Sequence, residues 1–134
     1  MDLLQKHYQK LDGLKFFLKK SNKDFKEFFE EPFHVLHWHG DRILLPNKAV
    51  LIASSARCKE QFFRIGNFAY GLRFHIETTA GMINNWIKED KEFVLKGLGL
   101  NGQEILKEEN KKYIDKTFLK RKLLISKLFE LLGN

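Results

Sequence analysis

The sequence has very little cysteine or proline and contains no long apolar stretch. Its single cysteine, Cys58, excludes a disulfide within the chain, and no segment is typical of a membrane span or a signal peptide. The two prolines, Pro32 and Pro46, each lie just outside an apolar run, and no repeat or low-complexity linker interrupts the chain. We therefore expect a soluble, cytoplasmic protein in which residues 1–134 form one domain.

Apolar and charged residues are both abundant. Hydrophobic residues make up 43% and charged residues 31% of the chain, a balance that favours a folded core over disorder. The net charge is +7, with 24 Lys and Arg against 17 Asp and Glu. Such a balance can attract nucleic acid. Because aromatic residues are not interleaved with the basic ones on an evident strand, we interpret the charge as a solvated helix surface. We predict neither a nucleic-acid nor a membrane partner.

Short apolar runs in the N-terminal part of the chain indicate β-strands. The run Ala49–Ala53 is continuous and is typical of a strand buried on both faces. Two further runs flank Gly66-Asn67 and predict a β-hairpin. A helical turn is expected over Asp24–Glu31, capped by Asp24 and ended by Pro32. Strands are expected over Leu14–Leu18, Phe33–Trp38, Ala49–Ala53, Gln61–Ile65 and Phe68–Phe74.

The pattern changes to a helical one after His75. Apolar residues recur at helical spacing from Met82 to Ile87, behind Thr78 and Thr79, either of which can cap the helix. Further helices are expected over Gln103–Tyr113 and Asp115–Leu132. The apolar face of the last helix is assigned to Phe118, Ile125, Phe129 and Leu132.

This order of strands followed by helices bears on the fold class. Without helical crossovers, the strands cannot form a doubly wound parallel sheet by themselves. They can form the antiparallel extension of such a sheet, with the helices covering it. The pattern therefore suggests that part of an α/β domain is missing.

Residues 37–41 (HWHGD) form the first group that can carry chemistry. They follow a predicted strand, and polar residues at strand ends are common in functional sites. His37, His39 and Asp41 can begin a metal site, which His75 and Glu77 would complete. The alternative is that these histidines bond to backbone groups in a loop, and the residues alone favour that alternative.

His75 and Glu77 form the second group, at another strand end. Residues two apart in an extended segment point to the same side, so the carboxylate can lie beside the imidazole. A carboxylate in that position orients a catalytic histidine and stabilises its charged form. An H-x-E pair is nevertheless weak support for catalysis, and a structural histidine is the commoner explanation.

Cys58 has basic neighbours, Arg57 and Lys59, which can lower the pKa of a thiol. A nucleophilic cysteine, however, usually sits on a tight turn flanked by glycine, and no glycine lies near Cys58. We therefore interpret Cys58 as a non-catalytic residue.

Several motifs, taken in order, resemble the class I glutamine amidotransferase family. Residues 37–41 with Leu45-Pro46 resemble its H-W-H-G-D…L-P segment. Residues 51–64 resemble its L-A-S-S…C…Q-x-F-R stretch, in which Cys58 matches a position that is not the nucleophile. Residues 70–78 (YGLRFHIET) resemble its Y-G-x-Q-F-H-P-E-x-T motif, and Trp86 falls where the next helix often carries tryptophan.

The resemblance implies an α/β fold, specifically the C-terminal part of a class I glutamine amidotransferase (flavodoxin-like) domain with antiparallel strands followed by helices. It implies that His75 is the general base and Glu77 its orienting acid. These residues would serve a cysteine that hydrolyses glutamine through a thioester and releases ammonia to a synthetase partner. Residues His37, His39 and Asp41 are expected in a substrate or partner loop. No cofactor and no metal are expected.

The departures from the family pattern are also informative. Arg73 stands where the family prefers glutamine, and Ile76 where proline is common. No G-x-C-x-G-x-Q string, the family's nucleophile elbow, is present. We therefore expect no glutaminase activity from this chain alone. We also expect an exposed edge beside Ala49–Ala53, which dimerisation or a complementary amidotransferase or synthetase chain would cover. The competing interpretations are a non-catalytic binding or regulatory module and a small metal-binding β protein built on His37, His39 and His75.

Overall fold

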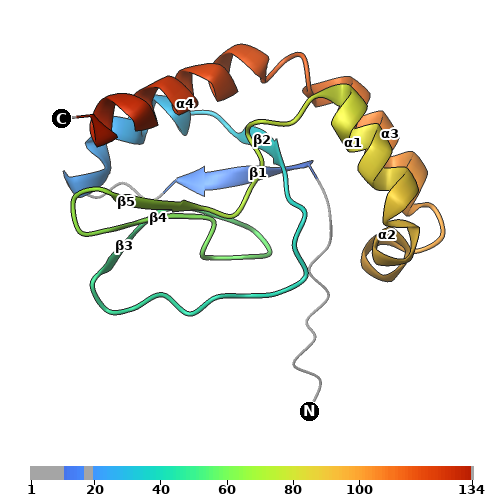
Figure 1. The fold of residues 1–134 in the computed structure, drawn as a ribbon, viewed down its shortest axis with the longest axis horizontal. Helices are drawn as coiled ribbons and strands as arrows, with labels where there is room; N and C mark the ends of the chain where they lie inside the picture. Colours follow the sequence, from blue (N-terminus) through green and yellow to red (C-terminus); the bar gives the residue numbers. More distant parts are fainter. Residues whose placement is uncertain (1–10, 17–19, 134) are drawn as a thin grey trace.

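The computed structural model describes residues 11–16 and 20–133, and it places the strands before the α-helices along the chain (Figure 1). The 3-10 helix η1 interrupts the strands between β1 and β2. The elements are β1 (Leu11–Phe16), η1 (Lys20–Phe28), β2 (Phe33–Leu36), β3 (Ala49–Ser55), β4 (Phe62–Ile65), β5 (Ala69–Leu72), α1 (Ala80–Glu89), α2 (Lys91–Leu98), α3 (Gly102–Tyr113) and α4 (Phe118–Leu132).

The described strands form one antiparallel sheet in the order β2-β1-β3-β4-β5. Strand β3 is central, and its pairing with β4 shifts register between Leu51 and Ala53. Strands β4 and β5 form the predicted hairpin. Its turn contains Gly66 at φ 62°, a left-handed conformation that favours glycine. A Cβ at Gly71 would clash with the Phe63 ring, so a larger residue there would displace that half-buried ring.

The ends of the two edge strands meet at one point. Leu36, the last residue of β2, forms an isolated antiparallel bridge with His75, which lies three residues after β5. The backbone N–H of His75 donates to the Leu36 carbonyl oxygen at 2.8 Å. The sheet therefore bends far enough to bring its two edges into contact at this bridge.

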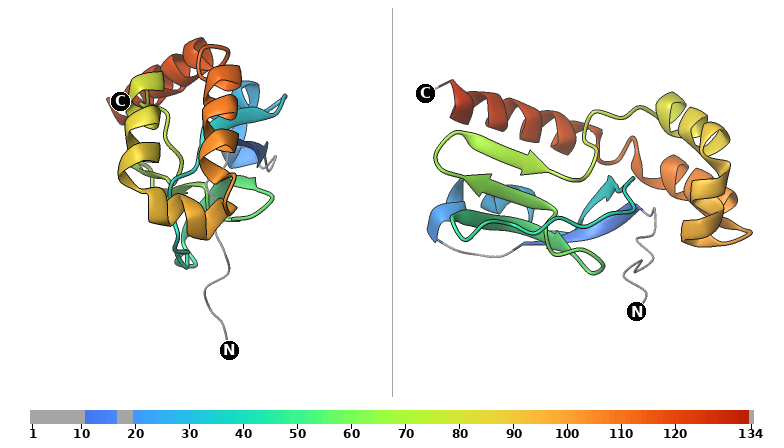
Figure 2. Two further views of the ribbon diagram at one scale, coloured as in Figure 1. Left: turned by 90° about the vertical axis from the view of Figure 1, so that its right-hand side faces the viewer. Right: turned by 60° about the horizontal axis from the view of Figure 1, so that its bottom comes forward.

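The larger part of the core lies between the sheet, η1 and α4. Helix α4 runs along the sheet, whereas α1, α2 and α3 are grouped beyond one end of it (Figure 2). Aromatic rings fill much of this core, and the centroids of Phe25 and Phe62 lie 4.8 Å apart with the rings edge to face. The buried members are Phe25, Phe28, Phe29, Phe33, Val35, Ile52, Ala53, Phe62, Phe74 and Leu124.

A second core joins the three grouped helices to the end of β2. Leu36 packs there with buried residues of α1, α2 and α3, among them Ile83, Val94 and Leu106. Helix α1 begins behind Thr79, whose hydroxyl accepts a hydrogen bond from the Met82 N–H at 3.2 Å, as the sequence predicted. Within the described part of the chain, no helix is long and apolar enough to cross a membrane.

The strand predictions are largely confirmed, with two corrections. Strand β1 begins before the predicted Leu14–Leu18, and residues 17–19 lie outside the described part. Strand β2 ends at Leu36, so His37 and His39 follow the strand rather than continue it. The exposed edge expected beside Ala49–Ala53 is covered in part. Strand β4 pairs along one side of this run, whereas the described pairing with β1 on the other side reaches only Ala53 of it.

The helix predictions need three corrections. The helix expected over Asp24–Glu31 is a 3-10 helix that begins at Lys20, so Asp24 lies inside it and does not cap it. Helix α2 was not predicted. The apolar face assigned to α4 is not its buried face. Phe118 and Phe129 are 60% and 72% exposed, whereas Arg121 and Leu124 are buried.

Phe62 offers a test of the main core. It is fully buried against the rings of Phe25, Phe29, Tyr70 and Phe74. Removing the ring in Phe62→Ala should lower the free energy of unfolding by about 3–5 kcal/mol, because it combines lost burial with a cavity. Urea denaturation measures this change. The matched control is Phe129→Ala, for which we expect a change within about 0.5 kcal/mol; equal effects at the two positions would contradict the packing described.

Candidate functional site

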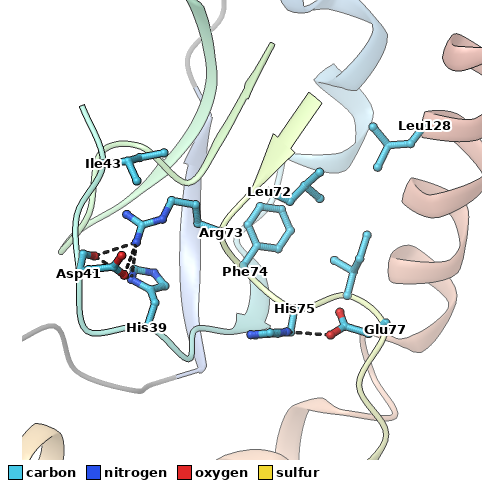
Figure 3. Close-up of a pocket in the computed structure, with 10 residues that line it drawn as sticks. His39, Asp41, Ile43, Leu72, Arg73, Phe74, His75, Glu77 and Leu128 are labelled. Carbon is cyan, nitrogen blue, oxygen red and sulfur yellow. Dashed lines mark hydrogen bonds and ion pairs between the residues drawn. The ribbon is translucent and has the colours of Figure 1, made fainter. Parts of the chain in front are cut away.

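The bridge between Leu36 and His75 places the two predicted motifs side by side. Residues 37–41 leave the end of β2, and residues 73–77 leave the end of β5. His39, Asp41, Arg73, His75 and Glu77 line one cleft of about 570 Å³ (Figure 3). Its other lining residues are Ile43, Leu72, Phe74, Ile76 and Leu128.

His75 and Glu77 form a hydrogen-bonded pair, with Nδ1 of the imidazole 2.7 Å from Oε1 of the carboxyl (Figure 3). Their side chains are 30% and 54% exposed, so the pair lies at the surface of the cleft rather than in the core. An ionised carboxylate only accepts hydrogen bonds, so Nδ1 is the donor and carries the proton. In the neutral imidazole, Nε2 is then left as a proton acceptor.

Opposing effects set the pKa of Glu77. Partial burial acts to raise it, whereas the hydrogen bond from His75, bonds to the backbone of Glu77 and Ile76, and the charge of His75 act to lower it. Together the lowering effects outweigh burial, and the pKa lies below the ordinary value of 4.5. Glu77 is therefore ionised at neutral pH. The Trp86 ring packs edge to face on the His75 ring, with the centroids 5.1 Å apart, and limits its movement from the α1 side.

Arg73 ties the loop after β2 to the segment after β5. Its Nη2 donates to the Asp41 carboxylate at 2.9 Å and to the Asp41 carbonyl at 2.8 Å, and it lies 3.3 Å from Nδ1 of His39. The Arg73 side chain is largely buried, whereas the Asp41 side chain is exposed. Because the guanidinium presents several donors in a fixed fork, one side chain can hold both the backbone and the side chain of Asp41.

Behind Arg73 lies a polar network that includes the single thiol. Arg73 Nη1 is 3.7 Å from the Cys58 sulfur, and that sulfur is 4.0 Å from Oε2 of Glu60. Arg42 binds the two oxygens of Glu60 at 3.0 and 3.1 Å, and this hydrogen bonding lowers the pKa of Glu60 against the opposing effect of burial. Cys58 is buried in this network, and among the described residues it does not line the cleft.

The structure therefore gathers four of the five predicted site residues. His39, Asp41, His75 and Glu77 share the cleft. His37 is buried behind it, with its ring near those of Phe74 and His39 at centroid distances of 6.4 and 6.2 Å. Within the described residues, no group of three or more His, Cys, Asp or Glu side chains is placed to hold a metal ion.

Two residues that matter to the site were not assigned a role from the sequence. Arg73 was noted only as a departure from a motif, yet it makes the contacts that hold the His39–Asp41 segment. Arg121, on α4, donates to the carbonyls of Ile76 and Thr78, on either side of Glu77. The available signal was the position of Arg121 between Phe118 and Ile125, next to the face assigned as apolar, because a buried arginine needs partners.

Comparisons with known proteins agree with the resemblance seen in the sequence. No family model matches the chain. It is 34% identical over 64 residues to the putative glutamine amidotransferase-like protein YfeJ of Salmonella typhimurium, a match that spans 48% of this chain and 27% of that protein.

Solved structures of glutamine amidotransferases match nearly the whole chain. The crystal structure of the Thermotoga maritima protein is 26% identical, with a TM-score of 0.69, over 97% of this chain and 53% of its own. That of the Methylobacillus flagellatus protein is 16% identical, with a TM-score of 0.73, over 95% of this chain and 54% of its own. The chain thus spans about half the length of these structures. It is similar in sequence to glutamine amidotransferases and has the fold of about half of one, the C-terminal part.

Proposed function

We propose that this chain supplies the base and the orienting acid of a glutamine-hydrolysing site, with His75 as the base and Glu77 as the acid. The observation that carries the proposal is the 2.7 Å bond between Nδ1 of His75 and Glu77 on the wall of an open cleft. The similarity to glutamine amidotransferases supports glutamine as the substrate.

The proposed chemistry follows from this arrangement. Nε2 of His75 accepts the proton of a cysteine thiol, and the sulfur attacks the side-chain amide carbon of glutamine. The imidazolium, stabilised by Glu77, then returns the proton to the leaving nitrogen, so ammonia departs and a glutamyl thioester remains. Water, deprotonated by His75, cleaves the thioester to glutamate and restores the thiol.

In this proposal, the nucleophile lies outside residues 1–134. Cys58 is the only cysteine, and it is buried against Arg73 and Glu60, outside the described lining of the cleft. A complementary chain that carries the nucleophile-bearing half of the domain would supply the sulfur. Without such a chain the His–Glu pair cannot form a thioester, so we expect negligible glutaminase activity from this chain alone.

An apolar stripe on α4 is the surface we assign to that partner. It consists of the exposed Phe118, Phe129 and Leu132 and the half-buried Ile125, and it lies beside the buried side of the helix. Phe118 and Ile125 border a hollow that also contains Glu77 and Thr78, so the stripe adjoins the acid of the pair. An exposed apolar surface next to a site is typical of an interface, and this chain has about half of a known fold. We therefore assign the stripe to the complementary half of that fold.

The buried position of Cys58 favours a second candidate, a non-catalytic binding or regulatory module. In that case the cleft and the stripe would serve binding alone. The two candidates differ in one result, namely whether a completed assembly releases glutamate.

Complementation tests the catalytic proposal. The chain would be mixed with the N-terminal part of the Thermotoga maritima relative, which lies outside the match, and glutamate release from glutamine would be measured. We expect activity only in the mixture. His75→Ala and Glu77→Gln should each lower it by roughly 10³-fold or more, because the base or its orientation is lost.

Two variants serve as controls for this assay. His34→Gln changes a histidine that stacks on Tyr113 outside the cleft, and Cys58→Ser removes the buried thiol. Both should retain activity in the mixture. A complex that forms but releases no glutamate would favour the binding module, and turnover by the isolated chain that Cys58→Ser abolishes would overturn the assignment of the nucleophile.

The lowered pKa of Glu77 predicts a pH-dependent contribution to stability. Because the folded pKa lies below the ordinary 4.5, ionised Glu77 stabilises the fold above about that pH, and the contribution disappears as pH falls through the folded pKa. Glu77→Gln should thus be less stable than the wild type at neutral pH, by less than about 1 kcal/mol since the group is half exposed.

Urea denaturation at several pH values measures this difference, which should shrink as the pH falls below the ordinary 4.5 and through the folded pKa. The control is Glu104→Gln, which removes an exposed helix carboxylate paired with Lys107 away from the cleft. A difference for Glu77→Gln that stays constant from neutral to acid pH would contradict the lowered pKa.

Substitutions on the stripe test the partner surface. Phe118→Asp and Phe129→Asp should each weaken binding of the complementary half at least about tenfold, since each places a charge in an apolar contact. Leu100→Asp, at an exposed apolar position between α2 and α3, should leave binding unchanged. Sedimentation equilibrium of the mixtures measures the dissociation constants. Equal dissociation constants for all three variants would exclude the stripe as the binding surface. If the chain instead forms a homodimer that the two Phe variants dissociate, the stripe binds a second copy of the chain.

A further inference from the structure

Arg121 is an almost fully buried charge in the first turn of α4, 5% exposed. Four hydrogen bonds surround its guanidinium. Nη1 donates to the carbonyls of Ile76 and Thr78 at 3.0 and 2.7 Å, Nη2 to that of Ile114 at 3.0 Å, and Nε to the Thr117 hydroxyl at 3.2 Å. Removing a charge from water is costly, and these bonds offset the cost.

The bonds of Arg121 lie on either side of the acid of the pair. Ile76 and Thr78 are the two neighbours of Glu77, and one nitrogen of Arg121 holds both of their carbonyls. On the other side of the pair, the His75 N–H is fixed to the Leu36 carbonyl. The four residues 75–78 are thus held at one end by the sheet and at the other by α4.

We propose that Arg121 is a positioning residue, which sets the backbone around Glu77 so that its carboxylate reaches Nδ1 of His75. A lysine cannot replace it, because a single ammonium lacks the planar fork that joins these carbonyls to that of Ile114. The positive charge of Arg121 also faces Glu77. Burial lowers the pKa of Arg121, whereas the charges of Glu77 and Asp115 act to raise it.

The consequence for catalysis rests on the proposed function, but the positioning itself does not. A displacement of His75 or Glu77 by about 1 Å can lower the catalytic rate roughly 10²-fold. The position of Glu77 can, however, be measured without any turnover. A failed glutaminase assay would therefore count against the proposed function only. The role of Arg121 would still be decided by measuring the position of Glu77 relative to His75.

NMR titration of the isolated chain tests the proposal. The carboxyl ¹³C signal of Glu77 reports its pKa, and the Nδ1 proton of His75 reports the hydrogen bond. In Arg121→Lys the charge remains, but the fork is lost. We expect the pKa of Glu77 to rise by about half a unit or more and the Nδ1 proton to lose its downfield shift. Arg121→Met should show the same changes.

Lys127→Met is the control, since it removes a charge from α4 outside the hollow that contains Glu77 and should leave both signals unchanged. If Arg121→Lys gives the wild-type signals, the proposal is overturned. A shifted pKa of Glu77 in Arg121→Met alone would then be explained by the loss of the positive charge rather than by the loss of positioning. If either arginine variant does not fold, Thr117→Val removes the partner of Nε, together with the bond from that hydroxyl to the Tyr113 carbonyl. A smaller change in the same direction would support positioning, and unchanged signals would overturn it.

Discussion

The hydrogen bond from the His75 N–H to the Leu36 carbonyl joins the ends of the two strands that lie at opposite edges of the sheet. The candidate site depends on it, because residues 37–41 and 73–77 are far apart in the chain and share a cleft only where these ends meet. The bonds from Arg73 to Asp41 span 32 positions and require the same closure. Although the edges meet, the His75–Glu77 pair stays partly exposed, so the bent sheet does not enclose it.

Two arginines then fix the walls of the cleft from opposite sides. Arg73 holds the His39–Asp41 segment, and Arg121 holds the backbone around Glu77. Both side chains are largely buried, where a charge is tolerated only with several hydrogen bonds. Each of them therefore stabilises one geometry of its neighbours rather than simply filling space. An apolar residue of similar size would pack in either position but would leave those carbonyl groups without these donors.

Local chemistry made much of the fold predictable. Turn residues at Gly66 and Asn67, and the hydroxyl of Thr79, act within a few positions, so the hairpin and the start of α1 were found correctly. The spacing of His75 and Glu77 also predicted their contact. Helix α2 was missed because Asp90 ends α1 and begins α2 with no glycine or proline between them. The buried face of α4 was not recognised because it combines Leu124 with Arg121, whose partners are carbonyls 43 and 45 positions away.

The same long-range contacts explain how half of a known fold can hold a formed pair. Its geometry comes from bonds inside this chain: Leu36 to His75, His75 to Glu77, and Arg121 to the carbonyls beside Glu77. None of these bonds involves a nucleophile. In the proposed function, the completing chain therefore needs only to bring a sulfur to Nε2 of His75 and to cover the apolar stripe on α4. Contacts within this chain already order the base and the acid. Association with the completing chain therefore carries no further entropic cost for ordering them, and it needs only to position the thiol.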